Sequence, residues 1–366
     1  MHRNDQASNH KKLKHQKKIG VWKIIPALIL LIIIELILRE KSVEKDFARL
    51  KSSASHQKRQ AVENLVRGCS AQQEHELPTY LSERLFGNCR SLVETSLKQA
   101  KLSTINLRFT DLSDADLSSA NLQNADLGFA KLYFTNLSHT NLNHADLSSA
   151  YLHLAQFEQA NLSNANLHRA NLHNANLFKT NLRNANFHNT ILSSANLSKA
   201  DLTGADFSDV AFHNAYLFKA NLTKTNLSKA RFGEARLNNA NLTKTNLSGA
   251  HLNNVDLYQA TLIGVKLEHA DLRGADLRRA ILLSTDFRKT KNLTQAQLEG
   301  IVHPNQLEGK IHPLICNSPL PKGINIDINR DCNKVAAALY KNNPSSFKKL
   351  EEAEKFVKEQ QLQKWN

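Results

Sequence analysis

Large apolar residues recur at every fifth position through the middle of this chain. From Leu92 to Phe287, all 40 of these positions hold Leu or Phe. Ala, Thr or Val lies two residues before each large residue from Leu97 onward, with Ile105 as the one substitute. Asn or Asp immediately precedes 25 of the 40 large residues. More than half of the chain therefore follows one five-residue pattern.

This period fits neither an isolated helix nor a straight strand. A helix turns by about 100° per residue, so residues five apart differ by about 140° and form no apolar stripe. In a straight strand the side chains alternate between two faces, and an odd period would send successive Leu residues to opposite faces. A corner within each repeat resolves this conflict, because it resets the phase before the next Leu.

The pattern predicts a β-solenoid. Within one repeat, the large residue and the residue two positions before it lie on the same strand face, so both point inward. The Asn or Asp between them and the two residues that follow face outward or turn, where polar residues are suited. Leucine-rich and other solenoids have longer repeats with unequal internal positions, so the equal five-residue period disfavours them.

The repeat resembles the pentapeptide-repeat family, whose consensus is A-(D/N)-L-x-x. Clear matches are Ala115-Asp116-Leu117, Ala125-Asp126-Leu127, Ala175-Asn176-Leu177, Ala200-Asp201-Leu202 and Ala275-Asp276-Leu277. The resemblance covers residues 92–290 and implies an all-β solenoid, a right-handed quadrilateral β-helix with four pentapeptides in each coil. Stacked at ~4.8 Å, about ten coils would form this domain.

The N-terminal region combines a basic head with one long apolar segment. Residues 1–18 hold six Lys or Arg residues, and residues 19–38 are almost entirely apolar. Twenty helical residues rise by ~30 Å, the thickness of a bilayer core. Trp22 and Lys23 suit the membrane interface, and no small-residue cleavage site follows the segment. We therefore expect an uncleaved transmembrane helix over residues 19–38, contacting the lipid bilayer, and a single-pass, membrane-anchored family member.

The charges around this segment bear on its orientation. Residues 39–58 also hold six Lys or Arg residues, so the count on the two sides is equal. Five of the six in the head lie between Lys11 and Lys18, close to the segment. The positive-inside rule then favours a cytoplasmic N-terminus and a repeat domain on the extracytoplasmic side.

Four cysteines flank the repeats, with Cys69 and Cys89 before them and Cys316 and Cys332 after them. Two local disulfides would staple the ends of the solenoid in an oxidising compartment, in agreement with export. This pairing is one of three connectivities, and four free thiols are the alternative. The close C-x-x-C spacing of zinc sites is missing, which disfavours a metal site.

The segments on either side of the repeats are expected to cover the two ends of the stack. An open end exposes a strand ladder and apolar core, which invites aggregation. We predict a helical linker and N-terminal cap over residues 39–91, with a helix over 42–67. Residues 291–366 would form the C-terminal cap, with a loop over 316–332 and an amphipathic helix over 345–364.

The sequence holds no recognisable catalytic motif. It has no nucleophile elbow, no phosphate-binding Gly loop and no ligand set at metal spacing, so we expect no enzyme activity, cofactor or small-molecule substrate. His residues 20 apart would stack in two columns: His153, His173 and His213, and His168 with His188. Because they lack carboxylate or thiol partners, they indicate tolerated outward residues rather than a metal site.

Charge is unevenly distributed. The whole chain carries a formal charge of +15, but residues 92–290 hold 20 Lys or Arg against 16 Asp or Glu. The high pI is therefore not the footprint of a nucleic-acid-binding repeat domain, and no nucleic-acid partner is expected. The quinolone-resistance branch of the resembled family mimics DNA with strongly acidic solenoids and binds type II topoisomerase. This near-neutral domain disfavours that role.

Two groups of outward residues stand out. If the coil is four-sided, Lys179, Lys199 and Lys219 stack in one column, and Lys224 with Lys244 in the next. Like charges on adjacent rungs repel, although a solvated face is the simpler interpretation. An apolar outward group lies near the first coils: Phe109, Phe129, Tyr133, Phe134 and Leu154. This group is either a partner contact or, as we favour, the seat of the N-terminal cap.

Together these features favour a non-enzymatic, membrane-anchored repeat protein that presents a rigid surface to an unknown protein partner. The alternative is a binding module for an anionic polymer or an anionic membrane surface, acting through the stacked lysines.

Overall fold

The computed structural model describes residues 34, 37–38, 40–52, 54–66, 91–300, 312–342 and 346–362. The chain divides into two compact units, Met1–Leu65 and Val66–Asn366, and each is described by itself.

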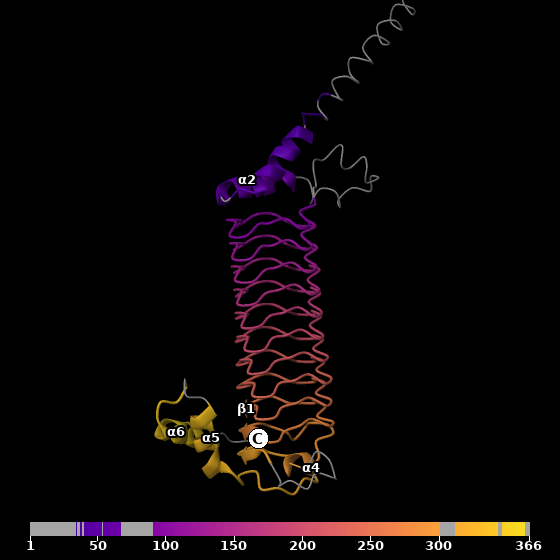
Figure 1. Ribbon diagram of the computed structural model, residues 1–366. Coiled ribbons are helices and arrows are strands. Elements are labelled where there is room, and N and C mark those ends of the chain that lie inside the picture. The colour runs from indigo at the N-terminus through magenta and orange to yellow at the C-terminus, as the bar shows by residue number, and fades with distance from the viewer. Residues whose placement is uncertain are drawn as a thin grey trace, which may run out of the picture. The chain divides into compact units, whose positions relative to one another are not determined.

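The first unit contains a pair of helical stretches. Residues 40–50 are helical, and α2 follows at Ser55–Leu65 (Figure 1). Val43 and Leu50 on the first stretch are buried, as are Ala61 and Leu65 on α2. The single helix expected over 42–67 is thus interrupted, because residues 51, 52 and 54 are not helical. The interruption lets α2 fold back, so that the buried Asp46 accepts a hydrogen bond from Asn64 Nδ2 at 3.1 Å.

The predicted transmembrane segment, residues 19–38, lies outside the described residues except at positions 34, 37 and 38. Among the residues that the structure describes, no helix has the length and apolar character needed to cross a bilayer.

The second unit is dominated by a stack of parallel coils (Figure 1). Each bridge joins a residue to the one 20 positions later, as in Ser96↔Asp116 and Asn176↔Asn196. The series continues to Asp271↔Lys291 and recurs four times per coil. This spacing confirms a β-helix with four five-residue repeats per coil over the described coils.

The interior is a continuous column of Leu and Phe side chains. All of these side chains from Leu92 to Phe287 are buried, together with the Ala, Thr or Val two residues before each one that follows Leu97. Phe187 and Phe207 stack at 4.4 Å between ring centroids, one coil apart. Where Thr replaces Ala, its hydroxyl can bond to the backbone, as Thr180 Oγ1 donates to the Phe157 carbonyl at 2.9 Å; the buried Thr110 Oγ1 is an exception without a partner among the described residues.

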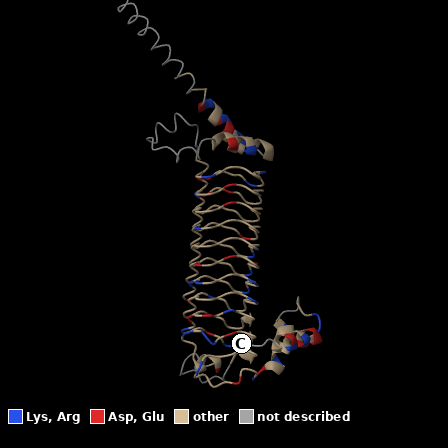
Figure 2. Ribbon diagram, turned by 180° about the vertical axis from the view of Figure 1, so that it is seen from behind, with Lys and Arg blue, Asp and Glu red and all other residues tan. Residues whose placement is uncertain are grey.

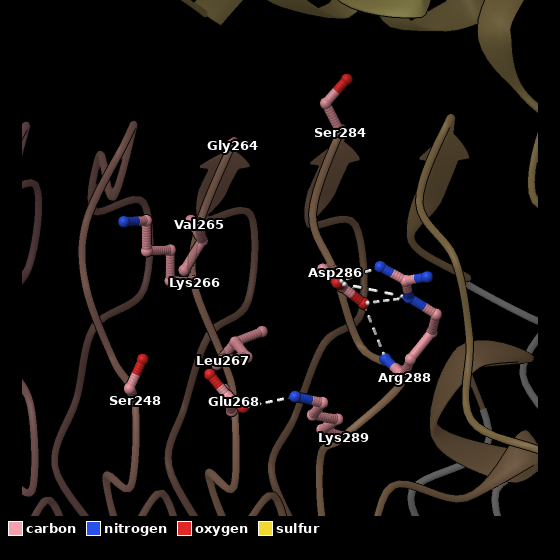
Figure 3. A pocket seen from close by; sticks show the side chains of 10 residues that line it. All are labelled: Ser248, Gly264, Val265, Lys266, Leu267, Glu268, Ser284, Asp286, Arg288 and Lys289. Carbon is pink, nitrogen blue, oxygen red and sulfur yellow. Dashed lines mark hydrogen bonds and ion pairs between the residues drawn. The ribbon is translucent and has the colours of Figure 1, made fainter. Parts of the chain in front are cut away.

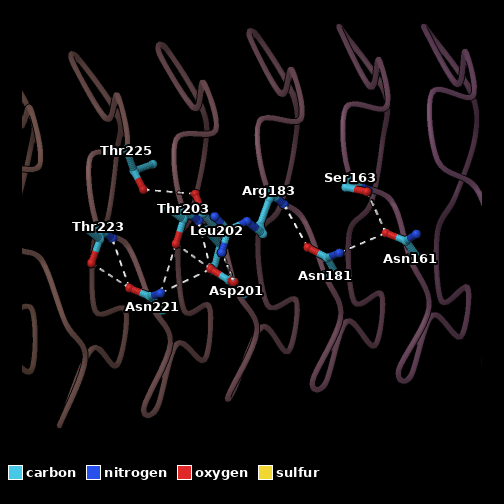
Figure 4. Close-up of polar contacts among 10 residues, drawn as sticks. All are labelled: Asn161, Ser163, Asn181, Arg183, Asp201, Leu202, Thr203, Asn221, Thr223 and Thr225. Atoms are coloured by element: carbon cyan, nitrogen blue, oxygen red, sulfur yellow. Dashed lines mark hydrogen bonds and ion pairs between the residues drawn. The ribbon is translucent and has the colours of Figure 1, made fainter. Parts of the chain in front are cut away.

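The Asn and Asp residues before each Leu hold the turns together. Their Oδ1 atom accepts the backbone N–H two residues ahead, as from Ser198 to Asn196 at 3.1 Å. The amide group also bonds between coils: Asn181 Nδ2 donates to Asn161 Oδ1 at 2.9 Å, a ladder drawn in Figure 4. One side chain thus satisfies a turn and links two coils, which is why Asn and Asp dominate this position.

Each corner is a tight turn, closed by a hydrogen bond such as Ala100 N to the Leu97 carbonyl at 3.0 Å. The second residue after each Leu adopts a positive φ, near 57° at Lys179. Non-glycine residues rarely adopt this conformation, and Asn or Gly adopts it most readily. The ladder on both sides enforces it here for many residue types.

Within the described coils, regular strands occur only in the last ones. β1 (Thr261–Ile263) and β2 (Ile281–Leu283) pair in parallel, and β3 (Leu314–Cys316) adds to β2 with Ile281↔Leu314. The chain therefore leaves the stack after residue 291 and returns to add one further strand. The expected loop over 316–332 begins with the last residue of this strand.

Described residues close several of the exposed backbone groups at this end of the stack. α4 (Gln295–Leu298) begins at the N-cap Thr294. The buried Gln297 Nε2 donates to the carbonyls of Leu272 and Ala275, both at 2.9 Å. Phe287 N donates to the Pro319 carbonyl at 2.9 Å. Polar side chains and the returning backbone thus form hydrogen bonds with backbone groups at the end of the stack.

The C-terminal helices lie against the side of the stack, not across its end. α5 (Cys332–Asn342) and α6 (Leu350–Gln361) pack on the outward side chains of Ile263, Ile281 and Leu283. The helix predicted over 345–364 is observed as α6. The outward positions of the last coils are apolar, and the helices cover them.

Candidate binding surface

The coil register places Lys179, Lys199 and Lys219 at the same corner of three successive coils. All three side chains are exposed. In the described part of the chain, no carboxylate forms an ion pair with any of them. Lys224 and Lys244 are likewise exposed, but they occupy the next corner and form a separate column.

Aromatic rings accompany the first lysine column. Lys179 Nζ and Lys199 Nζ lie 5.1 and 5.4 Å from the ring centroid of Phe178, and Lys219 Nζ lies 5.0 Å from that of Phe218. These are cation–π distances, and each contact is worth about 0.5–1 kcal/mol at an exposed site. The rings hold the ammonium groups against the wall.

The same side of the stack continues this pattern toward the C-terminus. Arg236 lies 5.2 Å from the Tyr216 ring centroid, and Arg279 lies 5.7 Å from that of Tyr258. We call this surface the basic–aromatic face; it consists of Phe178, Lys179, Lys199, Tyr216, Phe218, Lys219, Arg236, Tyr258 and Arg279. Sequence reasoning found only its lysines. The signal it missed is the aromatic residue at every second coil of one column: Phe178, Phe218 and Tyr258.

Two acidic residues lie at the C-terminal end of the basic–aromatic face. Arg278 Nη2 donates to Asp276 at 2.7 Å, which raises the pKa of the arginine. Partial burial raises the pKa of Asp256, and the neighbouring Asp276 charge adds to this effect, while the bond from Tyr258 N opposes it. Residues 171–250, by contrast, hold nine Lys or Arg against four Asp or Glu. Figure 2 marks these charged positions along the stack.

The predicted apolar residues near the first coils, which we call the aromatic patch, include separate pairs of contacting rings. Phe109 and Phe129 stack at 5.1 Å, and Arg108 lies over both rings. Phe129 and Phe134 are 39% and 54% exposed. Tyr133 contacts Tyr151, which the sequence pattern did not indicate, at 5.9 Å between centroids. The role of the patch as a seat for the N-terminal cap stays a prediction.

The histidine columns form as expected from the register. His153 stacks on His173 at 5.2 Å, and His168 on His188 at 5.4 Å. His188 Nδ1 lies 2.8 Å from Ser208 Oγ. Within the described ranges, no group of three His, Cys, Asp or Glu side chains is placed to hold a metal ion.

A hollow of about 470 Å³ opens on the wall of the last coils (Figure 3). Gly264 leaves room for it, and Arg288 and Lys289 line it. Arg288 bonds to Asp286 at 2.9 Å, and Lys289 bonds to Glu268. Burial opposes ionisation of Asp286, but the Arg288 contacts outweigh it and hold its pKa below the ordinary value.

The cysteine prediction divides into two parts. Cys316 and Cys332 form a disulfide that joins β3 to the start of α5. Cys69 and Cys89 lie outside the described residues, and their pairing stays a prediction.

Comparison with known proteins places the chain among repeat proteins. The family model for pentapeptide repeats matches eight copies over residues 91–128, 130–169, 170–209, 215–254, 256–291 and 266–302. A search of curated proteins finds no match. The fold of the matched family implies a right-handed quadrilateral β-helix.

Solved structures of similar repeats come from several sources. HetL, a pentapeptide repeat protein involved in heterocyst differentiation regulation in the cyanobacterium Nostoc, is 33% identical over 58% of this chain and 94% of its own, with a TM-score of 0.32. Rfr23 from the cyanobacterium Cyanothece is 44% identical over 23% of this chain and 58% of its own, with a TM-score of 0.23. QnrB1, a plasmid-mediated fluoroquinolone resistance protein, is 16% identical over 54% of this chain and 86% of its own, with a TM-score of 0.32.

Proposed function

Since this chain belongs to the pentapeptide-repeat family, we propose that it is a non-enzymatic interaction scaffold, anchored to a membrane through residues 19–38 and carrying its coils on the extracytoplasmic side. One observation carries the scaffold role: the Leu and Phe column is fully buried, so the coil interior has no room for a substrate. Function then falls to the outward side chains on a rigid wall.

The aromatic patch is the proposed contact for a protein partner. Exposed aromatic residues beside an arginine are typical of interface centres, where Tyr, Phe and Arg are enriched. Phe134 and Phe129 supply exposed ring area on adjacent turns of the wall, and Arg108 supplies a planar cation held above Phe109 and Phe129. Because these side chains point outward, their substitution should leave the core intact.

Crosslinking and affinity purification of the full chain from membranes tests this proposal. We expect Phe129→Ser with Phe134→Ser to lose the captured partner, while Ile191→Ser, an exposed apolar residue on other coils, should retain it. Capture that is equal for both variants would reject the patch. Protease accessibility of the coils in sealed vesicles would check the proposed membrane side separately.

The basic–aromatic face supports a second function, binding of an anionic polymer. Lys179, Lys199 and Lys219 lie on adjacent rungs, and each ammonium group lies within 5.4 Å of an aromatic ring centroid. Three exposed cations without an ion-pair partner among the described residues would offer an anionic polymer a continuous row of positive charge.

Salt dependence of binding tests the second function. Replacing Lys179, Lys199 and Lys219 by Ser should weaken binding of an anionic polymer and flatten its salt dependence, because fewer counterions are released. Lys229→Ser, an exposed lysine in another column, is the matched control. Binding that is unchanged in the triple variant would reject this function.

A further inference from the structure

The aromatic rings of the basic–aromatic face have a period of their own. Phe178, Phe218 and Tyr258 occupy the same outward position, and the coils between them carry Ser198 and Asn238 there. Bridges such as Asn176↔Asn196 and Asn196↔Tyr216 fix this column coil by coil. The rings therefore recur every second coil, ~9.6 Å apart at ~4.8 Å per coil. Each ring is half-buried, so part of it remains open to solvent.

Each ring has a cation beside it. Lys179 on the same coil and Lys199 on the next coil both lie close to the Phe178 ring, Lys219 lies beside Phe218, and Arg279 lies beside Tyr258. Amide and hydroxyl groups from Ser198 and Asn238 fill the intervals. A ligand along this wall would meet a ring, a polar group and a ring again, with positive charge at each ring.

We propose that the basic–aromatic face binds an acidic, extended β-linked polysaccharide, with two sugar units spanning two coils. This inference deepens the anionic-polymer function proposed above and rests on it. In such a glycan the same ring face recurs at every second sugar, which matches the recurrence of the aromatic side chains. The apolar C–H face of a sugar packs on an aromatic ring, while its carboxylate meets the neighbouring ammonium or guanidinium group.

The observations favour a glycan over single-stranded nucleic acid. Nucleic-acid-binding walls stack successive bases on successive aromatic rings along a basic track. Here Ser198 and Asn238 interrupt the rings, so adjacent bases would find no ring on alternate coils. Hydroxyl and amide groups at those positions instead suit hydrogen bonds to sugar hydroxyls.

The test measures binding of the full chain in a polyoxyethylene detergent to three soluble probes. These are a β-1,4-linked mannuronate hexamer, the neutral mannose hexamer of the same linkage, and a glutamate hexapeptide of similar charge. We expect the mannuronate hexamer to bind at least about tenfold more tightly than either of the others, a difference of about 1.4 kcal/mol.

Substitutions test the contribution of the aromatic rings separately from that of the lysines. Phe178→Ser with Phe218→Ser copies the residue found at Ser198, so the coils should fold unchanged. This variant should lose the preference for mannuronate over the glutamate peptide by about tenfold. Ile191→Ser, which alters an exposed apolar residue outside this face, should keep it.

The outcomes distinguish a failure of the glycan inference from a failure of the anionic-polymer function on which it rests. Equal binding of mannuronate and glutamate hexamers, lost in the triple lysine variant, would overturn the glycan inference and leave the anionic-polymer function standing. No binding of either acidic probe would overturn both. Tighter binding of a single-stranded thymidine hexanucleotide than of the mannuronate hexamer would also overturn the glycan inference.

Discussion

In the coil stack, the surroundings of a residue recur every 20 positions, whereas in residues 312–362 each buried contact occurs once. Leu202 sits in a column of identical neighbours and needs only the coils on either side. Ser284 Oγ, by contrast, donates to the Gln360 carbonyl, 76 residues away in the chain. The stack is thus built from repeated neighbour contacts, and the C-terminal segment from specific long-range ones. The two regions should respond differently to damage.

The largest effect is expected from a cavity in the column. Leu202→Ala removes a fully buried side chain and should lower the free energy of unfolding by about 2–5 kcal/mol. Urea denaturation followed by circular dichroism would measure it. Ser198→Ala, outward on the preceding repeat, is the control and should have little effect. If both variants lost the same free energy of unfolding, the stability of the stack would not come from the buried column.

Breaking the Cys316–Cys332 disulfide should damage the other region alone. Cys316→Ser with Cys332→Ser opens a closed loop with a sequence separation of 16, a loss of about 3 kcal/mol in a chain-entropy account. Hydrogen exchange should then accelerate in α5 and α6. Residues 92–250 should keep their protection, because the helices pack on Ile263, Ile281 and Leu283, which lie in later coils. Faster exchange throughout the coils would show that the two regions are not separable.

A smaller effect is expected from the amide ladder. Asn181→Ala removes the bond to Asn161 and leaves the Arg183 backbone N–H without its acceptor, which should cost about 1 kcal/mol. The converse variant, Ile191→Asn, places an amide where an exposed Ile now stands and should add stability. Unfolding midpoints in urea would report both. If Asn181→Ala unfolds at the same urea concentration as the parent, the amide ladder does not contribute to the stability of the stack.

The smallest effect concerns pH at the end of the stack. Burial raises the pKa of Asp256, so the folded state binds its proton more tightly than the unfolded state, and stability falls as pH rises through the folded-state pKa. Asp256→Asn keeps the acceptor for Tyr258 N and should therefore be slightly more stable than the parent at pH 7. The difference should vanish in acid, where the carboxyl is protonated.

The pH dependence of stability expected for Asp286 has the opposite sign to that expected for Asp256. Its pKa is lowered by the contacts with Arg288, so its contribution is present above the unfolded-state pKa and is lost as pH falls through the folded-state pKa. Asp286→Asn should thus be less stable than the parent at pH 7, with a difference that shrinks in acid. Parallel urea titrations of the two variants would show both trends, and trends of the same sign would contradict these assignments.

The sequence predicted only some of the contacts on the binding surface. The lysine columns follow from a 20-residue coil, and so do the histidine stacks, because register alone places those residues on adjacent rungs. The contact of Lys199 with Phe178 joins residues of different types on different coils, so a column of identical residues does not predict it. Similarly, Ile263, Ile281 and Leu283 are outward apolar residues, a signal that α5 and α6 cover this wall.

The five-residue period by itself determined a coil, its buried column and the polar turns, because each depends only on neighbours at a constant spacing. Four repeats per coil, and so the positions that share a corner, were implied by the family resemblance and are confirmed by the bridges between residues 20 apart. The tertiary structure decided how the chain leaves that pattern. After residue 291 it turns through α4, returns as β3 beside β2, and lays two helices on the outward apolar residues. Those contacts join segments far apart in sequence, and no local period encodes which distant surface a segment will bury.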